Sequence, residues 1–473
     1  MKTHPLIIGA GRVATRETAE VVNPYTGRAF ARVHLASPAE IEKAVTSAAK
    51  AFEITRRQSS HAVASLLRRV VECMAKKRAR LVDSIVAEAG KPVSLAAQEV
   101  DRSITTFTIA AEEASRLGGE YLPVDIDARS EGRAAVTRRF PIGVVAGITP
   151  FNFPLNLVAH KVAPAIASRN AIVIKPATKT PLTALMLGEI LLEAGMTPGQ
   201  VNIIPCRAEV GERLVTSERV AKLSFTGSAA VGWRLKSLAG RKRVTLELGG
   251  NAAAVIHSGA DLDWAVKRTA LGAFGYAGQT CISVQRILVH KPVYAKVARM
   301  LVKELNANIK AGDPRRPDVT VGPMIDRAAL DKTHEWVKEA VAGGARILAG
   351  GRRRGPCYLP TLIAGVNPRM KVVCQEVFAP VATVQSYATF GQAIRMVNDS
   401  EYGLQAGVFT SDLAHAFEAF ESCDVGGVIV NDFPTFRVDN MPYGGVKMSG
   451  FGREGVRYAM EEMTELRVMV IRR

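Results

Sequence analysis

Residues 144–154 read VVAGITPFNFP, an apolar run followed by a loop with two prolines and two phenylalanines. The run predicts a buried β-strand over 144–148, because it is apolar throughout and too short for a helix. Similar runs recur at intervals of about 20 to 30 residues, which leaves room for crossover helices, such as one over 182–193. This alternation predicts a parallel sheet covered on both faces, and hence an α/β fold. The further runs lie at 171–174, 201–204, 222–225 and 244–246.

The residues before this sheet predict short strands followed by helices. The first thirty or so residues favour a β-rich lead-in, with a turn at 23–27. Ser37, Pro38 and Glu40 combine an N-cap, a first-turn proline and a capping glutamate, so a helix should run from there to about Phe52. Apolar periodicity predicts two further helices, the first broken once at most, over about 60–89 and 93–116.

A second α/β region is predicted to begin near Asn251. The polar segment at about 120–140 breaks the helical pattern and predicts an extended excursion. The alternating tail at 466–471 predicts a strand that could pair with another chain. The helices expected in the second region lie at about 261–274, 292–309, 327–342 and 412–421.

Size and charge limit the classes of protein to consider. A chain of 473 residues exceeds what one hydrophobic core usually serves, so two or three domains are expected. The formal charge of +18 suggests nucleic acid or an acidic membrane as partner. The basic residues, however, occur in short groups at 76–78, 241–243 and 352–354, without interleaved aromatic residues. A solvated basic surface that attracts small anions, with no nucleic acid or membrane partner, is the favoured interpretation.

The six cysteines are scattered and lack paired spacing, which argues against a disulfide framework and against a metal site. No apolar run is long enough for a signal-peptide core or a membrane span. A reducing, cytoplasmic location is therefore expected.

Cys281 follows a glycine-rich, mostly uncharged segment that begins at Gly272. Glycine lets the backbone approach a ligand closely, and a deprotonated cysteine there would attack an electrophilic carbon. A small buried residue inside a helix is an equally good interpretation of the same segment. The choice between the two depends on other parts of the chain.

Polar residues follow several of the predicted strands, at the edge where ligands of parallel sheets bind. Asn152 offers an amide that could stabilise an oxyanion, and Lys175 could reach a ribose or a phosphate. The strand-to-helix segment 225–232 has glycines five residues apart, which is a weak dinucleotide pattern. Glu247, if buried, would titrate high enough to act as a base. An ordinary turn asparagine and a surface lysine remain open alternatives for the first two.

Together these segments resemble the aldehyde dehydrogenase superfamily over nearly the whole chain. Seven motifs occur in that family's order, and their intervals match. The resemblance implies an α/β fold with a Rossmann-like parallel-sheet cofactor domain, a second α/β catalytic domain and a small β oligomerisation flap. The motifs are PFNFP at 150–154, IKPA at 174–177, FTGS at 225–228, ELGG at 247–250, GQTC at 278–281, EVFAP at 376–380 and GVKMSG at 445–450.

The resemblance also implies domain limits and an assembly. The NAD(P)-binding domain would comprise 1–120 and 141–249, and the catalytic domain 250–445. The flap would comprise 121–140 and 459–473. Family members of this kind form a homodimer or a homotetramer.

By resemblance, Cys281 is the nucleophile, Asn152 and the Cys281 backbone N–H form the oxyanion hole, and Glu247 is the general base. Thiolate attack on an aldehyde, hydride loss to the nicotinamide and hydrolysis of the thioester would yield a carboxylic acid. Glu247 favours hydrolysis over acylation of coenzyme A, which is kept as an alternative. A basic nucleic-acid-binding protein and a non-catalytic relative are further alternatives.

The cofactor implied by the resemblance is NADP or NAD. Lys175 and Glu376 would bind its two riboses, Ser228 its pyrophosphate, and Phe378 would flank the nicotinamide. Thr178 stands where NAD-preferring relatives often carry glutamate, and with Lys175 and Lys179 nearby it favours NADP slightly. The complete predicted set is Thr149, Pro150, Lys175, Ala177, Thr178, Gly227, Ser228, Gly249, Glu376 and Phe378.

For the substrate, the segments at 99–102, 156–161 and 431–443 resemble the branch that acts on lactaldehyde, phosphonoacetaldehyde and other short polar aldehydes. Arg102, His160 and Arg437 could then hold an anionic tail, although structural ion pairs explain them equally well. Thr280 argues against a phosphorylated substrate, because relatives that handle one can carry arginine at that position. A hydroxyaldehyde or a semialdehyde is the broader expectation.

Overall fold

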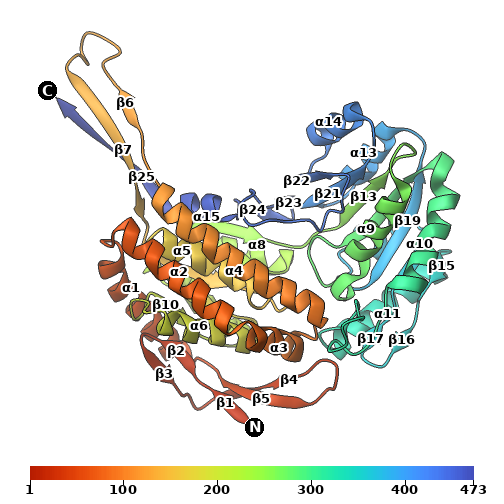
Figure 1. Ribbon diagram of the computed structural model, residues 1–473, viewed down its shortest axis with the longest axis horizontal. Helices are drawn as coiled ribbons and strands as arrows, with labels where there is room; N and C mark the ends of the chain where they lie inside the picture. The colour runs from red at the N-terminus through yellow and green to blue at the C-terminus, as the bar shows by residue number, and fades with distance from the viewer. Residues whose placement is uncertain (473) are drawn as a thin grey trace.

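The computed structural model describes residues 1–472 and contains two large sheets with helices packed on them (Figure 1). The first sheet has eight strands in the order β24-β12-β11-β8-β9-β10-β2-β3. Its five central strands are parallel, as the apolar runs predict. They are β8 (Val144–Ile148), β9 (Ala171–Lys175), β10 (Val201–Ile203), β11 (Val220–Thr226) and β12 (Arg243–Glu247).

The edges of this sheet are antiparallel, which the repeat of apolar runs does not predict. β2 (Leu6–Ile8) pairs with β10, and β3 (Gly11–Val13) pairs with β2. On the other edge, β24 (Gly450–Phe451) pairs with β12. Residues near the C-terminal end of the chain therefore lie directly beside Glu247. The β-rich lead-in continues as a separate three-stranded sheet of β1 (Lys2–His4), β5 (Ala29–His34) and β4 (Thr18–Val22).

The helices before the sheet begin and end close to their predicted limits. Ser37 and Glu40 form the expected capping box of α1 (Pro38–Thr55). The long periodic segment is interrupted at Lys77, which separates α2 (Ser60–Lys76) from α3 (Arg78–Ala89). Helices α2 and α3 form a layer with α4 (Val93–Arg116), α5 (Asn156–Ala167) and α6 (Leu182–Glu193) on one face of the sheet (Figure 1). Helix α1 packs on the opposite face, in a separate apolar cluster with Val144, Ala146 and Val173.

The second sheet has seven strands in the order β15-β18-β19-β14-β13-β21-β22. Its inner strands are parallel, and the four predicted helices lie close to the expected positions, with α13 (Phe390–Asn398) in addition. The strands are β13 (Ala252–Ile256), β14 (Val284–His290), β15 (Arg346–Ala349), β18 (Thr361–Ala364), β19 (Val381–Tyr387), β21 (Gln405–Phe409) and β22 (Gly427–Val430). The predicted helices are α9 (Leu262–Phe274), α10 (Tyr294–Asn308), α11 (Arg327–Ala342) and α14 (Leu413–Ser422).

A three-stranded flap projects from the first sheet (Figure 1). The excursion supplies β6 (Tyr121–Pro123) and β7 (Arg133–Pro141), and the tail supplies β25 (Thr464–Arg472). β25 pairs with β7 of its own chain along its whole length and forms one edge of the flap. Arg473, the last residue of the predicted flap, lies outside the described residues.

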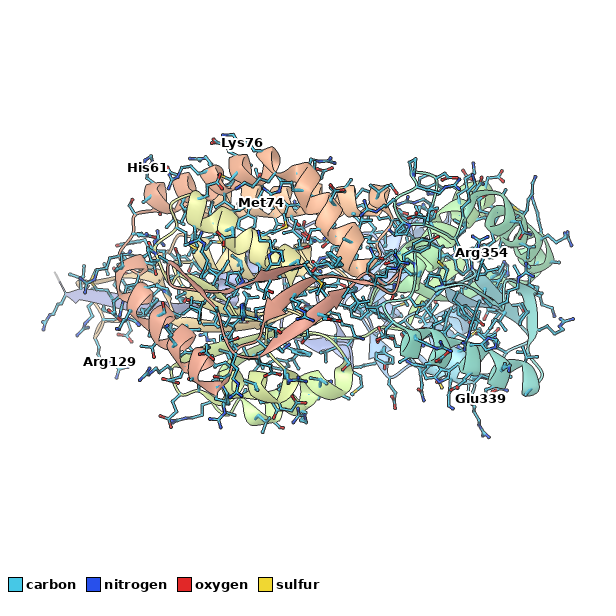
Figure 2. All side chains as sticks on the ribbon, turned by 90° about the horizontal axis from the view of Figure 1, so that it is seen from below. His61, Met74, Lys76, Arg129, Glu339 and Arg354 are labelled. Atoms are coloured by element: carbon cyan, nitrogen blue, oxygen red, sulfur yellow. The ribbon has the colours of Figure 1, made fainter. Side chains whose placement is uncertain are left out.

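The basic side chains are spread over the surface. In Figure 2, Lys76, Arg129 and Arg354 lie far apart on the molecule. Within residues 1–472, no helix combines the length and the apolar character that crossing a membrane requires. The same residues contain no group of three or more histidine, cysteine or acidic side chains suited to a metal ion.

Candidate active site

A cavity of about 250 Å³ brings together most of the predicted site residues. Loops that follow β8, β11 and β12 of the first sheet form part of its wall, and segments next to the second sheet form the rest. The predicted residues that line it are Arg102, Pro150, Asn152, His160, Gly227, Ser228, Glu247, Gly249, Thr280, Cys281, Glu376, Phe378 and Arg437.

Cys281 lies in a turn before β14, so the alternative of a small residue inside a helix is wrong for this segment. Its half-buried thiol is 3.3 Å from the hydroxyl of Tyr443. Burial raises the pKa of the Cys281 thiol to about 11, so the thiol is protonated at neutral pH. Gly278 has a φ of 63°, and a Cβ there would lie 2.2 Å from the Ala379 carbonyl oxygen, so this turn requires glycine.

Asn152 connects the first sheet to the loop that carries Cys281. Its side-chain Nδ2 donates a hydrogen bond of 3.0 Å to the backbone oxygen of Gln279, two residues before the cysteine. Asn152 is 4% exposed, and its Oδ1 has no partner among the described residues. An amide carries two N–H donors, so one remains for a ligand oxygen in the cavity.

Glu247 ends β12 with its carboxyl group buried in the cavity wall. Neither carboxyl oxygen has a hydrogen-bond partner among residues 1–472. Burial raises the pKa of Glu247 well above its usual value, and the nearby Glu454 carboxylate raises it further. A buried carboxyl with a raised pKa is suited to accept a proton from water.

The residues predicted to hold a dinucleotide divide into two groups. In the cavity, the hydroxyl of Ser228 at the start of α8 (Ala229–Leu238) makes no capping bond and is free for a ligand. Glu376 accepts a hydrogen bond of 3.0 Å from the Gly250 N–H, and burial raises its pKa to about 7. Phe378 adopts a left-handed φ of 56° and packs edge-on against Phe151.

The other group, Thr149, Lys175, Ala177 and Thr178, lies outside the cavity. The Lys175 ammonium is buried and donates a hydrogen bond of 3.2 Å to the Pro176 carbonyl. The Thr178 hydroxyl donates to the Cys206 carbonyl, and Lys179 is paired with Asp326. The charge of Lys179 is thus already neutralised by a carboxylate.

Three predicted substrate residues belong to a buried ionic network. Asp439 accepts hydrogen bonds from Arg102 (2.7 Å) and from His160 Nε2 (2.8 Å). The His160 Nδ1 faces Arg437 Nη2 at 3.0 Å, so the proton of a neutral His160 lies on Nε2. Arg102 and His160 are therefore held by Asp439, as the ion-pair alternative expects.

Arg437 differs from its two neighbours. Its side chain is 6% exposed and it pairs with Glu454 at 3.3 Å, but its Nε, which lies 4.0 Å from Asp439 Oδ1, makes no hydrogen bond among the described residues. The guanidinium lies 3.5 Å from the centroid of the Tyr443 ring, and Tyr443 contacts Cys281. A buried donor without a partner beside the reactive thiol is suited to an anionic ligand group.

Sequence reasoning assigned no role to four charged or polar residues of this site: Tyr443, Asp439, Glu454 and Lys161. Lys161 lies in α5, whose residues are all buried, and its ammonium binds Glu454 at 2.8 Å. A lysine next to His160 in a mostly apolar helix is a signal in the sequence for this buried lysine.

A model of the aldehyde dehydrogenase family matches residues 12–469. The 3-sulfolactaldehyde dehydrogenase of Priestia aryabhattai is 43% identical over 100% of this chain and 98% of that protein. Aldehyde dehydrogenase 21 of Physcomitrella patens, solved with the reaction product succinate, is 41% identical with a TM-score of 0.97, covering 100% of this chain and 98% of that one. Glyceraldehyde-3-phosphate dehydrogenase of Methanocaldococcus jannaschii, solved with NADP, is 36% identical with a TM-score of 0.93, covering 97% and 100%.

Proposed function

This chain belongs to the aldehyde dehydrogenase family, and we propose that it oxidises a short aldehyde with an anionic or strongly polar tail to its carboxylic acid. The observation that carries the proposal is the position of Arg437, which lines the same cavity as Cys281 and whose Nε makes no hydrogen bond among the described residues. Oxidation of the aldehyde group requires NADP+ or NAD+ as the hydride acceptor.

The cavity residues fit a dinucleotide. The free hydroxyl of Ser228 and the N-terminus of α8 are suited to a pyrophosphate. The Glu376 carboxyl is suited to ribose hydroxyls, and Gly249 leaves room beside it, because a Cβ there would lie 2.4 Å from Glu376 Oε2. When bound, the nicotinamide supplies the acceptor for one hydride.

In the first half of the reaction, the Cys281 thiol gives its proton to solvent water and the sulfur forms a bond to the aldehyde carbon. The carbonyl π electrons move to the oxygen, which the free Asn152 N–H and the Cys281 backbone N–H stabilise. With a nicotinamide dinucleotide held by Ser228 and Glu376, loss of hydride to it would let the oxygen electron pair re-form the carbonyl, which would oxidise the aldehyde and leave a thioester on Cys281.

In the second half, Glu247 accepts a proton from a water molecule as the water oxygen attacks the thioester carbonyl. The carbon–sulfur bond breaks, the leaving sulfur takes the proton from Glu247, and the carboxylic acid is released while the Cys281 thiol and the Glu247 carboxylate are restored. The unpaired, buried state of Glu247 supports this role, because no salt bridge has to be broken before the carboxylate takes the proton.

The proposed substrate carries a sulfonate or a carboxylate. Two similar proteins, one named for 3-sulfolactaldehyde and one solved with succinate, have ligands that combine a short chain with such an anion. Arg437 offers the charge-assisted hydrogen bond that either group needs. Thr280 beside the nucleophile supplies no second cation, which supports these anions over a phosphate ester.

The test is a kinetic comparison of 3-sulfolactaldehyde, succinate semialdehyde and the neutral lactaldehyde. We expect Arg437→Met to lower kcat/KM about 30-fold for the two anionic aldehydes, through one lost charged hydrogen bond, and about threefold or less for lactaldehyde. Arg102→Met is the matched control, because the Arg102 guanidinium already donates a hydrogen bond to Asp439. An equal loss for charged and neutral aldehydes in Arg437→Met would rule out the anionic subsite.

For the cofactor, a slight preference for NADP+ is proposed from Thr178, which places no carboxylate near the adenosine ribose. Lys179 adds little to this preference, because Asp326 neutralises it. Dissociation constants of NADP+ and NAD+ measured by protein fluorescence decide the question, and tighter binding of NAD+ would contradict the preference.

A further inference from the structure

Lys91 is a fully buried cation that the mechanism above does not use. It precedes α4, and its side chain is 0% exposed. Its ammonium pairs with Glu99, lies 3.5 Å from the centroid of the Phe153 ring and lies 4.4 Å from the centroid of the Tyr276 ring. A buried ammonium requires an opposite charge or hydrogen-bond acceptors, and the two aromatic faces stabilise this one further.

On one side, this pair contacts the loop that carries Asn152. Phe153 is the residue next to Asn152. The second oxygen of Glu99 accepts hydrogen bonds from the backbone N–H groups of Leu155 (2.9 Å) and Asn156 (3.1 Å) at the start of α5. The Lys91–Glu99 pair thus holds both ends of the short segment that follows Asn152.

On the other side, the pair contacts the segment that leads to Cys281. Tyr276 and Ala277 have left-handed φ values of 52° and 55°, which such residues keep only when their surroundings enforce them. The Tyr276 ring packs under Lys91, and its hydroxyl donates to the Ala89 carbonyl at 3.3 Å. These contacts hold the strained turn in place.

The two sides meet at Gln279. Its backbone N–H donates to the Tyr276 carbonyl at 3.1 Å, and its own carbonyl accepts the Asn152 amide at 3.0 Å. The contacts therefore form a closed path from Lys91 through Phe153, Asn152, Gln279 and Tyr276 back to Lys91 (the Lys91 clamp).

We propose that Lys91, with Glu99, is a positioning residue that sets the Asn152 amide relative to the Cys281 sulfur. The inference rests on the proposed function, since these two groups act on the same carbonyl in that mechanism. The clamp acts through Phe153 and Tyr276 and does not touch substrate. Its loss displaces the oxyanion donor from the thiol but leaves the dinucleotide residues Ser228 and Glu376 in place.

The primary test is Lys91→Met, which keeps the length of the side chain and removes its charge. We expect kcat per dinucleotide-binding site to fall about 100-fold, because a small misplacement of catalytic groups has an effect of this size. The dissociation constant of the dinucleotide should stay within about twofold of wild type. Titration calorimetry with NADP+ counts the folded sites, so a loss of folded protein is separated from a loss of turnover.

A matched pair at Tyr276 tests the same clamp without altering the buried charge. Tyr276→Phe keeps the ring under Lys91 and should retain kcat within about threefold, whereas Tyr276→Leu should lose it nearly as far as Lys91→Met. If Lys91→Met binds no dinucleotide, this pair decides the question.

Each outcome points to one conclusion. A wild-type protein that oxidises no aldehyde refutes the proposed function. An active wild type combined with unchanged kcat per site in Lys91→Met, or with equal kcat in the two Tyr276 variants, overturns the positioning role of Lys91.

Discussion

At the scale of single residues, the site contains a thiol and a carboxyl group whose pKa values are both raised. Burial is the main cause of the raised pKa in Cys281 and in Glu247. The reactive form of each group is the deprotonated one, and a rise in pH favours that form in both.

The first prediction concerns the thiol. With a pKa of about 11, Cys281 should react with iodoacetamide at a rate that rises about tenfold per pH unit between roughly pH 7 and 9, because only the thiolate reacts. Mass spectrometry of the peptide that contains Cys281 measures the rate, with the exposed Cys374 as internal reference. A rate that levels off below about pH 8 would contradict the raised pKa.

The second prediction concerns the carboxyl group. Glu247→Gln should form the thioester normally and hydrolyse it slowly, so the first turnover should release close to one reduced cofactor per site, followed by a steady rate about 100-fold lower. Stopped-flow absorbance shows the burst, and Cys281→Ser should remove it. A slow first turnover without a burst would place Glu247 in the first half of the reaction instead.

At the scale of structural elements, the Asp439 carboxylate ties the segment at 431–443 to α4 and α5. It accepts hydrogen bonds from Arg102 of α4 and His160 of α5, 337 and 279 residues away in the chain. Burial alone would raise the pKa of Asp439, but His160 and Arg102 outweigh it and hold that pKa well below its usual value. The carboxylate therefore stabilises the folded protein above its unfolded pKa, and this contribution is lost as the pH falls.

The third prediction follows from this loss of stability at low pH. Asp439→Asn should lower stability by about 3 kcal/mol at pH 7, because it leaves buried partners unpaired, and the difference from wild type should shrink below about pH 4. Urea unfolding of both proteins between pH 7 and 3 measures it. Asp101→Asn is the control, since Asp101 pairs with Arg78 on the surface and should cost only about 0.5 kcal/mol. A difference that does not change with pH would contradict the coupling.

At the scale of the whole molecule, the flap exposes apolar side chains. β25 is an edge strand, and its apolar side chains are exposed, among them Val468 (61%) and Val470 (55%). An exposed apolar edge of this length is typical of a strand that pairs or packs in an assembly. This supports the proposed homodimer or homotetramer, with the flap as an interface.

The fourth prediction tests the assembly. The double substitution Val468→Glu and Val470→Glu should shift the protein to a monomer, because two buried carboxylates would disfavour the interface. Light scattering during size-exclusion chromatography measures the mass. Arg129→Glu at the exposed flap end is the control and should leave the mass unchanged (Figure 2). A double variant that keeps the wild-type mass would place the interface elsewhere.

The sequence by itself determined the α/β fold, the five parallel strands of the first sheet and the family. An apolar strand segment and a helix cap each depend on residues that are neighbours in the chain. The strand VVAGI at 144–148 and the capping box at Ser37 could therefore be predicted correctly. The motif order placed Asn152 and Glu247 near Cys281, and both line its cavity, whereas the predicted residues Thr149, Lys175, Ala177 and Thr178 lie outside it.

Only the tertiary structure decided which charged side chains already have hydrogen-bond partners within the protein and which keep a donor for a ligand. Arg102, His160 and Arg437 were equivalent candidates in the sequence. Asp439 forms hydrogen bonds with the first two, whereas the Nε of Arg437 lies 4.0 Å from Asp439 and makes no hydrogen bond. In the same way, Lys91 became informative only when Phe153 and Tyr276 were found around it. Such contacts join residues far apart in the chain, and their energies depend on burial, which packing of the whole molecule sets.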